Sequence, residues 1–207
     1  MSPHAGRLIV FEGIDGSGKS TQVRRLAERL RAMRTPHSVF FEPTRMTHGA
    51  QIRRLAAEGR EAISPEREAE LFRLDRMDDV RVNLAPALAR GEVVLLDRYY
   101  FSTMAYQGAL GLDIEQIRRD NEAFAPPPDI ALYFDLDPDR AIERIRHSRR
   151  QAPDLFERAE YLAQVRAIFQ SFDMPYWRTL NAAQPPDVLE RDVWALVEPI
   201  LLPRANP

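Results

Sequence analysis

Short apolar runs alternate along the chain with longer stretches in which apolar residues recur at helical spacing. The short runs are rich in β-branched and aromatic residues, and they predict five strands, over residues 7–12, 38–42, 93–97, 130–136 and 176–181. The longer stretches predict helices over residues 19–33, 50–57, 64–90, 113–124, 137–150, 155–172 and 188–202. Because strands and helices alternate, we predict an α/β fold with a five-stranded, doubly wound parallel sheet flanked by helices.

Residues 101–111 show neither pattern. They mix aromatic, small and polar side chains, so we assign them no helix or strand, and residues 106–108 either line a pocket or pack in the core. Three prolines at 126–128 form a stiff connector into the fourth predicted strand. The length of 207 residues suits one sizeable core, so residues 1–207 are expected to form a single domain.

The segment between the first strand and the first helix indicates the clearest chemistry. Gly13, Gly18 and Lys19-Ser20 have the spacing of a phosphate-binding loop, in the strand–loop–helix context that the motif requires. Glycines let backbone N–H groups curl around phosphates, and the next helix points its positive end at the anion. Lys19 is expected to reach the outer phosphates and Ser20 to bind Mg²⁺. The predicted ATP contacts of the loop are Gly13, Ile14, Asp15, Gly16, Ser17, Gly18, Lys19, Ser20 and Thr21.

Charged residues also follow two other strands at their carboxyl ends, where open parallel sheets bind ligands. Asp97 is a candidate for holding the water shell of Mg²⁺, and Arg98 is a candidate for holding a second phosphate. The alternative for these two residues is a simple ion pair at the strand end. Arg45 follows the second strand, and its position alone does not separate an anion contact from a solvated arginine.

Phe72 and Arg76 share one face of the predicted helix 64–90, because they are four residues apart. An aromatic ring beside a forked donor can stack on a base and hydrogen-bond to it. Periodicity alone still favours a core role for Phe72.

A basic run from Arg144 to Arg150 precedes a break at residues 151–153. A run of charges is usually a solvated helix face. The alternative is a short basic lid, at about residues 146–153, that closes over the phosphates, excludes water and adds positive charge.

Composition narrows the classes of function. The chain has 29 basic and 31 acidic residues and a net charge of −2, so nothing in its overall charge favours binding to nucleic acid. It has no cysteine, which excludes disulfides, thiolate catalysis and cysteine-ligated zinc. No apolar run is long enough to span a membrane, and the first strand begins too early to leave room for a signal peptide. A cytoplasmic location is therefore expected.

With these pieces in place, the chain resembles the thymidylate kinase family of P-loop nucleoside monophosphate kinases over nearly its whole length. The resemblance rests on the segment Phe11–Thr21, on Glu42-Pro43, on Phe72 with Arg76, on Asp97–Tyr99 with Ser102 and residues 105–108, and on Pro128-Asp129. The block from Asp97 to Gly108 is the most specific of these, because it separates the family from other proteins with a P-loop.

The resemblance implies a reaction in which the γ-phosphoryl group of MgATP passes to the 5′-phosphate of thymidylate (dTMP), for dTTP synthesis, in a protein that is usually a homodimer. It implies that Arg98 grips the acceptor phosphate with Arg45, and that Asp15 lies near the 3′-hydroxyl. Phe72 would stack on the base and Arg76 would donate to it. The other implied acceptor-site residues are Glu42, Thr103 and Gln107 near the base and Tyr106, which would crowd the 2′ position and favour deoxyribose.

The resemblance also implies a catalytic arginine. Residues 14–17 of the loop contain no basic residue, so the lid should supply it, from Arg149 or Arg150 rather than from Arg144 or Arg146. Asn181 would lie beside adenine.

Three segments depart from the usual pattern of the family. Thr44-Arg45 replaces glycines after Glu42-Pro43, residues 73–75 replace small residues between Phe72 and Arg76, and the lid lacks an Asp-Arg-x-Glu pattern. Within the second segment, Asp75 either pairs with Arg76 or changes the base preference. The alternatives are therefore a kinase for another deoxynucleoside monophosphate or for a deoxynucleoside, and a binding module switched by ATP. Two arginines at the acceptor end favour a phosphorylated acceptor.

Overall fold

The computed structural model describes residues 6–58, 63–148 and 156–201. Within these ranges the chain forms one five-stranded parallel sheet in the order β2-β3-β1-β4-β5. The strands are β1 (Arg7–Glu12), β2 (His37–Phe41), β3 (Val93–Asp97), β4 (Ile130–Asp135) and β5 (Trp177–Asn181). The predicted α/β fold with five parallel strands is confirmed, and each strand lies within one residue of its predicted bounds.

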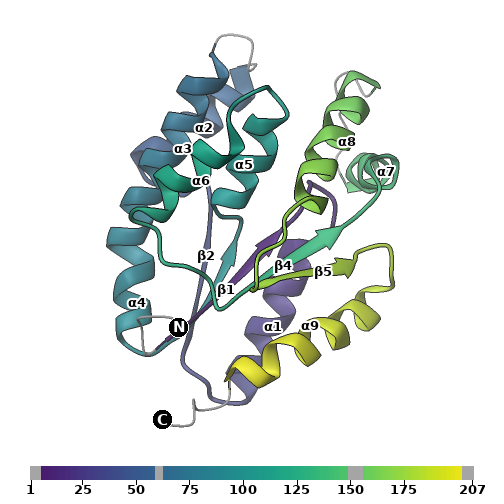
Figure 1. The fold of residues 1–207 in the computed structure, drawn as a ribbon. Helices are drawn as coiled ribbons and strands as arrows, with labels where there is room; N and C mark the ends of the chain where they lie inside the picture. Colours follow the sequence, from purple (N-terminus) through teal and green to yellow (C-terminus); the bar gives the residue numbers. More distant parts are fainter. Residues whose placement is uncertain (1–5, 59–62, 149–155, 202–207) are drawn as a thin grey trace.

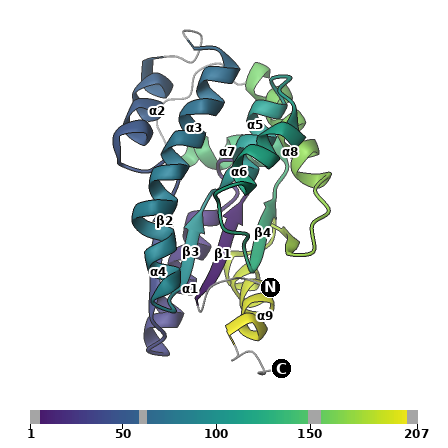
Figure 2. The same cartoon turned by 60° about the vertical axis from the view of Figure 1, so that its left-hand side comes forward.

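Helices cover both faces of this sheet (Figures 1 and 2). The described helices are α1 (Lys19–Ala32), α2 (Thr47–Glu58), α3 (Pro65–Asp79), α4 (Ala85–Ala89), α5 (Tyr100–Gly108), α6 (Ile114–Glu122), α7 (Pro138–Ser148), α8 (Phe156–Gln170) and α9 (Pro186–Leu201). Helices α1 and α9 pack against each other on one face, while α3 to α6 lie on the other. Among the described residues, no helix combines the length and apolarity that crossing a membrane requires.

The register of the strands brings their carboxyl ends to one edge of the sheet. Asp97 at the end of β3 lies opposite Phe11 on β1 and Phe41 on β2. Strand β1 is paired on both sides, with β3 and with β4, so the loop after it emerges at the centre of this edge. The edge therefore gathers the glycine-rich loop, Asp97 and Arg98.

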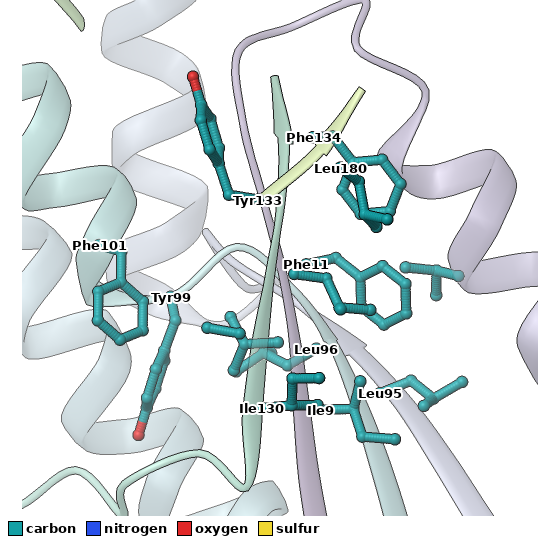
Figure 3. Packing of buried hydrophobic residues seen from close by; sticks show 14 of the residues in the cluster. Ile9, Phe11, Leu95, Leu96, Tyr99, Phe101, Ile130, Tyr133, Phe134 and Leu180 are labelled. Atoms are coloured by element: carbon teal, nitrogen blue, oxygen red, sulfur yellow. The ribbon is translucent and has the colours of Figure 1, made fainter. Parts of the chain in front are cut away.

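Aromatic and aliphatic side chains from the strands pack on both faces of the sheet (Figure 3). Phe11 and Phe134 stack with ring centroids 5.9 Å apart on one face, and Tyr99 and Phe101 lie on the other. Strands β1, β3 and β4 are buried along nearly all of their length, which explains why they appear in the sequence as continuous apolar runs.

Two helical segments differ from their predictions. The expected helix over residues 64–90 is divided by a π-helical turn at Val80–Leu84, in which the N–H of Ala85 donates to the carbonyl of Val80. Pro86 follows this turn, and a proline disrupts α-helical hydrogen bonding because it lacks an N–H and its ring needs space. Residues 100–108, to which no element was assigned, form α5, and Tyr100 and Phe101 at its start are fully buried.

Candidate active site

The glycine-rich loop passes close to neighbouring backbone, and this explains two of its glycines. Gly13 has a φ of +141°, and a Cβ there would lie 2.7 Å from the carbonyl oxygen of Phe134 on β4. Gly16 has a φ of +81°, and a Cβ there would lie 2.7 Å from the carbonyl oxygen of Ala141 on α7. A side chain at either position would therefore push the loop away from the sheet edge and from α7.

Lys19 opens α1 and is buried inside the loop that precedes it. Its Nζ donates to the carbonyl oxygens of Gly13 and Ile14, both at 2.9 Å. Burial and the nearby Arg98 guanidinium lower the pKa of Lys19 to about 8. The ammonium group is thus held at the centre of the predicted phosphate site.

Ser20 and Asp97 lie in contact, because β3, which ends at Asp97, is paired with β1, which leads into the loop. Ser20 Oγ, in the first turn of α1, donates to Asp97 Oδ2 at 2.5 Å. A hydroxyl and a carboxylate side by side are oxygen ligands of the kind that Mg²⁺ prefers, with substrate phosphates and waters completing its shell. Among the described residues no group of three or more His, Cys, Asp or Glu side chains could hold a metal ion.

Arg98 bridges the glycine-rich loop and α5. Its φ of +74° turns the chain sharply after β3. Its Nη2 donates to Asp15 Oδ1 at 2.5 Å, and its Nη1 donates to Ser102 Oγ at 2.9 Å. The guanidinium lies 5.4 Å from the centre of the Tyr106 ring. The structure therefore holds the Arg98 guanidinium between the phosphate loop and α5.

Glu12 is a residue of this edge to which sequence reasoning assigned no role. It is fully buried, and its carboxylate accepts from the backbone N–H of Tyr99 at 2.8 Å and of Ser102 at 3.2 Å, and from Ser102 Oγ at 2.6 Å. These N–H groups belong to the start of α5, so Glu12 caps that helix. Burial raises the pKa of Glu12. The sequence did contain a signal for such a role, because Glu12 is an acidic residue at the end of an otherwise apolar strand.

A cavity of about 380 Å³ opens between the loop and helices α2, α3 and α5. It contains six of the predicted acceptor-site and catalytic residues, namely Asp15, Phe72, Arg98, Thr103, Tyr106 and Gln107. Its remaining lining residues are Pro43, Ile52, Arg53, Ala56 and Ser102. The cavity combines an aromatic side chain, polar groups and two arginines, which suits a nucleotide.

A larger groove of about 590 Å³ begins at the phosphate loop and runs between α1 and β2. Lys19, Ser20 and Asp97 line its inner end. Asp15 and Arg98 line both this groove and the smaller cavity, so the two spaces meet at these side chains.

Arg45, which the resemblance placed at the acceptor phosphate, does not line the 380 Å³ cavity. It is exposed, and its guanidinium lies 5.7 Å from the centre of the Phe41 ring. Arg53 on α2 lines the cavity instead and donates to the carbonyl oxygen of Pro43 at 2.8 Å. Sequence reasoning missed Arg53 because it sits beside Arg54 in a predicted helix, where nothing indicates which arginine faces inward.

Arg76 and Glu42 also lie behind the cavity wall rather than on it. Arg76 is 1% exposed, and its guanidinium donates twice to Glu42 Oε2, at 2.6 and 2.8 Å. It also donates to Asn121 Oδ1 at 2.7 Å and to Thr103 Oγ1 at 3.3 Å. Arg76 itself does not line the cavity, whereas its partner Thr103 does.

Asp75 pairs with Thr44 and not with Arg76. Its two carboxylate oxygens accept from the backbone N–H and the hydroxyl of Thr44, at 2.7 and 2.6 Å. This buried contact ties α3 to the turn after β2, so both departures from the usual sequence pattern, at Thr44 and Asp75, form one structural unit. Asp75 does not line the cavity.

The adenine side of the predicted site is only partly described. Arg144 on α7 donates to the carbonyl oxygens of Gly16 at 3.3 Å and of Ala182 at 3.0 Å, which links the phosphate loop to the loop after β5. Asn181 ends β5, and its Oδ1 accepts from the N–H of Ala183 at 3.0 Å. The two arginines proposed as catalytic, Arg149 and Arg150, lie outside the described residues, as does most of the predicted lid.

Comparisons with known proteins show the family of the chain. A family model described as thymidylate kinase matches residues 11–193. A thymidylate kinase of Desulfotalea psychrophila is 44% identical over 201 residues, which are 97% of this chain and 98% of that protein. A thymidylate kinase of Akkermansia muciniphila is 48% identical over 177 residues, which are 86% of this chain and 84% of that protein. One of Xanthomonas euvesicatoria is 44% identical over 97% of this chain and 87% of that protein.

Proposed function

The chain belongs to the thymidylate kinase family, and we propose that thymidylate binds in the 380 Å³ cavity and that the phosphates of ATP bind at the inner end of the 590 Å³ groove, with adenine toward the loop after β5. The protein transfers the γ-phosphate of ATP to thymidylate and releases ADP and dTDP. The observation that carries the placement is that Asp15 and Arg98 line both spaces. A phosphate of each nucleotide can therefore reach the same pair of side chains.

On the donor side, the backbone N–H groups of residues 13–21 and Lys19 hold the ATP phosphates. Lys19 Nζ exchanges its present contacts with the carbonyls of Gly13 and Ile14 for phosphate oxygens. Adenine lies beside Asn181, near the loop after β5, and the contact of Arg144 with the Ala182 carbonyl, which links that loop to α7, supports this position. Ser20 and Asp97 hold Mg²⁺, which when bound neutralises charge on the β- and γ-phosphates.

On the acceptor side, the base of thymidylate stacks on Phe72 in the 380 Å³ cavity. Thr103 and Gln107 face the edge of the base, and Tyr106 faces the sugar. Arg98 and Arg53, in place of Arg45, hold the 5′-phosphate at the end of the cavity nearest the loop. A bound phosphate takes over the guanidinium N–H groups that now meet Asp15 and Ser102.

An oxygen of the 5′-phosphate attacks the γ-phosphorus, and the bond from that phosphorus to the bridging oxygen of ADP breaks. The protein has little covalent work to do in such a transfer, since alignment and neutralised charge supply most of the rate. Arg98 lies between the two phosphates. Arg149 or Arg150 of the lid would add positive charge as the transition state forms.

Turnover with three acceptor conditions tests this function against its rivals. ADP release is measured with MgATP alone, with thymidine and with thymidylate. We expect release to depend on thymidylate. ADP release that depends on thymidine instead would indicate a nucleoside kinase. Slow ADP release at the same rate with and without either acceptor would indicate a binding module switched by ATP.

The remaining proposals concern the whole protein. We infer a single domain over residues 1–207 that works in the cytoplasm as a homodimer. Met77 and Val82, which are 40% and 51% exposed on α3 and the π-helical turn, support an interface on that side. Sedimentation equilibrium gives the mass in solution, and a monomer at micromolar concentration would refute the dimer.

A further inference from the structure

A buried pair of polar side chains connects the two helices behind the base end of the acceptor cavity. Glu68 on α3 and Gln107 on α5 are 6% and 1% exposed. Gln107 Nε2 donates to Glu68 Oε2 at 2.9 Å. Gln107 also lines the cavity, and its Oε1 has no hydrogen-bond partner within the part of the chain that the structure describes.

The chemistry of this pair leaves the Gln107 amide one orientation. An ionised carboxylate only accepts hydrogen bonds, so the group that faces Glu68 has to be the amide NH₂. The opposite orientation would bring two acceptor oxygens together in a buried place. The amide carbonyl oxygen is therefore the group left over, and a buried oxygen without a donor favours any ligand that brings an N–H.

We propose that Glu68 is a positioning residue that selects the base of the acceptor nucleotide by turning the Gln107 carbonyl oxygen toward the cavity. This inference rests on the proposed function, which places the base there. Thymine and uracil carry an N–H at ring position 3 that donates to this oxygen. Cytosine carries an unprotonated nitrogen at that position, so two acceptors would face each other without a hydrogen.

A second pair of side chains, Arg76 on α3 and Thr103 on α5, connects the same two helices beside Glu68 and Gln107. Glu68, Phe72 and Arg76 occupy successive turns on one face of α3, and Thr103 and Gln107 occupy successive turns of α5. Arg76 donates to Thr103 Oγ1 at 3.3 Å, which leaves the Thr103 hydroxyl hydrogen to donate elsewhere. The cavity thus offers a donor at Thr103 and an acceptor at Gln107, with Phe72 also lining it. A thymine edge offers the complementary carbonyl and N–H.

Exchange of the carboxylate for an amide tests the proposal. In Glu68→Gln the new amide at position 68 can donate or accept a hydrogen bond, so Gln107 can turn either its carbonyl oxygen or its NH₂ group to the cavity. We expect the ratio of kcat/KM for dCMP to that for dTMP to rise by about 10- to 100-fold. The ratio for dUMP to dTMP should stay unchanged, because uracil has the same N–H.

Glu70→Gln is the matched control. Glu70 lies on the same helix and pairs with Arg73 at a partly exposed position, so this variant should leave both ratios unchanged.

A swapped variant, Glu68→Gln with Gln107→Glu, keeps one carboxylate and one amide in contact and turns a carboxylate oxygen to the cavity. It should restore the preference against dCMP, and because it contains the same buried groups it provides a second measurement if Glu68→Gln fails to fold. An unchanged dCMP ratio in Glu68→Gln, an equal loss with dTMP, dUMP and dCMP, or a swap without restored preference would each overturn the role of Glu68. Absence of thymidylate turnover in the unaltered protein would instead refute the proposed function.

Discussion

Arg45 and Arg53 both follow β2, yet their guanidinium groups have different surroundings. Both side chains are exposed, but Arg53 lines the 380 Å³ cavity and donates to the Pro43 carbonyl, whereas Arg45 lies beside Phe41 and does not line that cavity. The resemblance implied Arg45, whereas its position after β2 alone did not separate an anion contact from a solvated arginine. The direction that α2 turns Arg53 depends on its packing against α3, which no local pattern records.

Alanine substitution at these two arginines separates them. Arg53→Ala should raise the KM for thymidylate by about 10- to 100-fold, the usual effect of losing a hydrogen bond to a charged group. Arg45→Ala should change it by less than about threefold, because Arg45 does not line the cavity and its charge is exposed to solvent. Initial rates at saturating ATP measure both values. A larger effect at Arg45 than at Arg53 would reverse the assignment.

The lowered pKa of Lys19 predicts an alkaline limit to ATP use. Its ammonium loses a proton near pH 8 in the free protein, and kcat/KM for ATP should fall as pH rises through that value. The phosphate groups of the substrates titrate near pH 6, so they do not account for this limb. In Lys19→Arg the guanidinium keeps its charge at all these pH values, so the residual kcat/KM for ATP should not decrease as pH rises through 8. A wild-type profile that stays flat past pH 8 would contradict the burial effect.

At the scale of elements, α5 shows where sequence patterns stop being informative. The strands β1, β3 and β4 were predicted within one residue because each is buried on both faces and continuously apolar. Helix α5 was not predicted because none of its residues is exposed and its polar side chains Thr103 and Gln107 are buried among apolar ones, so no solvent-facing side marks a helical period. The start of α5 is set by Glu12, which is far away in the sequence.

Removal of the Glu12 cap should destabilise α5. Glu12→Ala leaves the N–H groups of Tyr99 and Ser102 without their acceptor and should lower the free energy of unfolding by about 3 kcal/mol. Glu12→Gln should recover part of this loss, since an amide oxygen still accepts. Urea unfolding measures the change, with Glu28→Ala, in an exposed ion pair with Arg24, as the control. Equal effects at Glu12 and Glu28 would rule out the cap.

The types of residue in the site could be predicted from the sequence, but which of them line the cavity and which lie behind its wall could not. The phosphate loop, Asp97 and Arg98 were identified because their spacing and strand ends are visible in the sequence. The separation of Thr103, which lines the cavity, from Arg76 and Glu42, which lie behind it, requires three-dimensional packing. Roles carried over from a family pattern do not record whether a residue acts directly or through a neighbour.

At the scale of the whole molecule, buried acids make stability depend on pH. Burial, followed by the nearby carboxylates of Asp79 and Asp75, raises the pKa of Glu42 from 4.5 to about 8 against the opposing effect of Arg76. Burial likewise raises the pKa of Asp79 from 3.8 to about 6. Between the ordinary and the raised values the folded protein binds more protons than the unfolded chain, so its stability falls as pH rises.

The free energy of unfolding should therefore decrease from pH 5 toward pH 8, and Glu42→Gln should reduce this slope. Urea unfolding across that range gives the slope. A slope that is the same in Glu42→Gln and in the wild type would mean that Glu42 is ionised throughout.

A crystal structure of the protein with ADP, Mg²⁺ and thymidylate tests the central claim, that the two nucleotides meet at Asp15 and Arg98. The account predicts thymine on Phe72 with its N–H at Gln107, the 5′-phosphate between Arg98 and Arg53, and the ADP phosphates on residues 13–21. A thymidylate phosphate held by Arg45, or a base outside the cavity lined by Phe72 and Gln107, would contradict it.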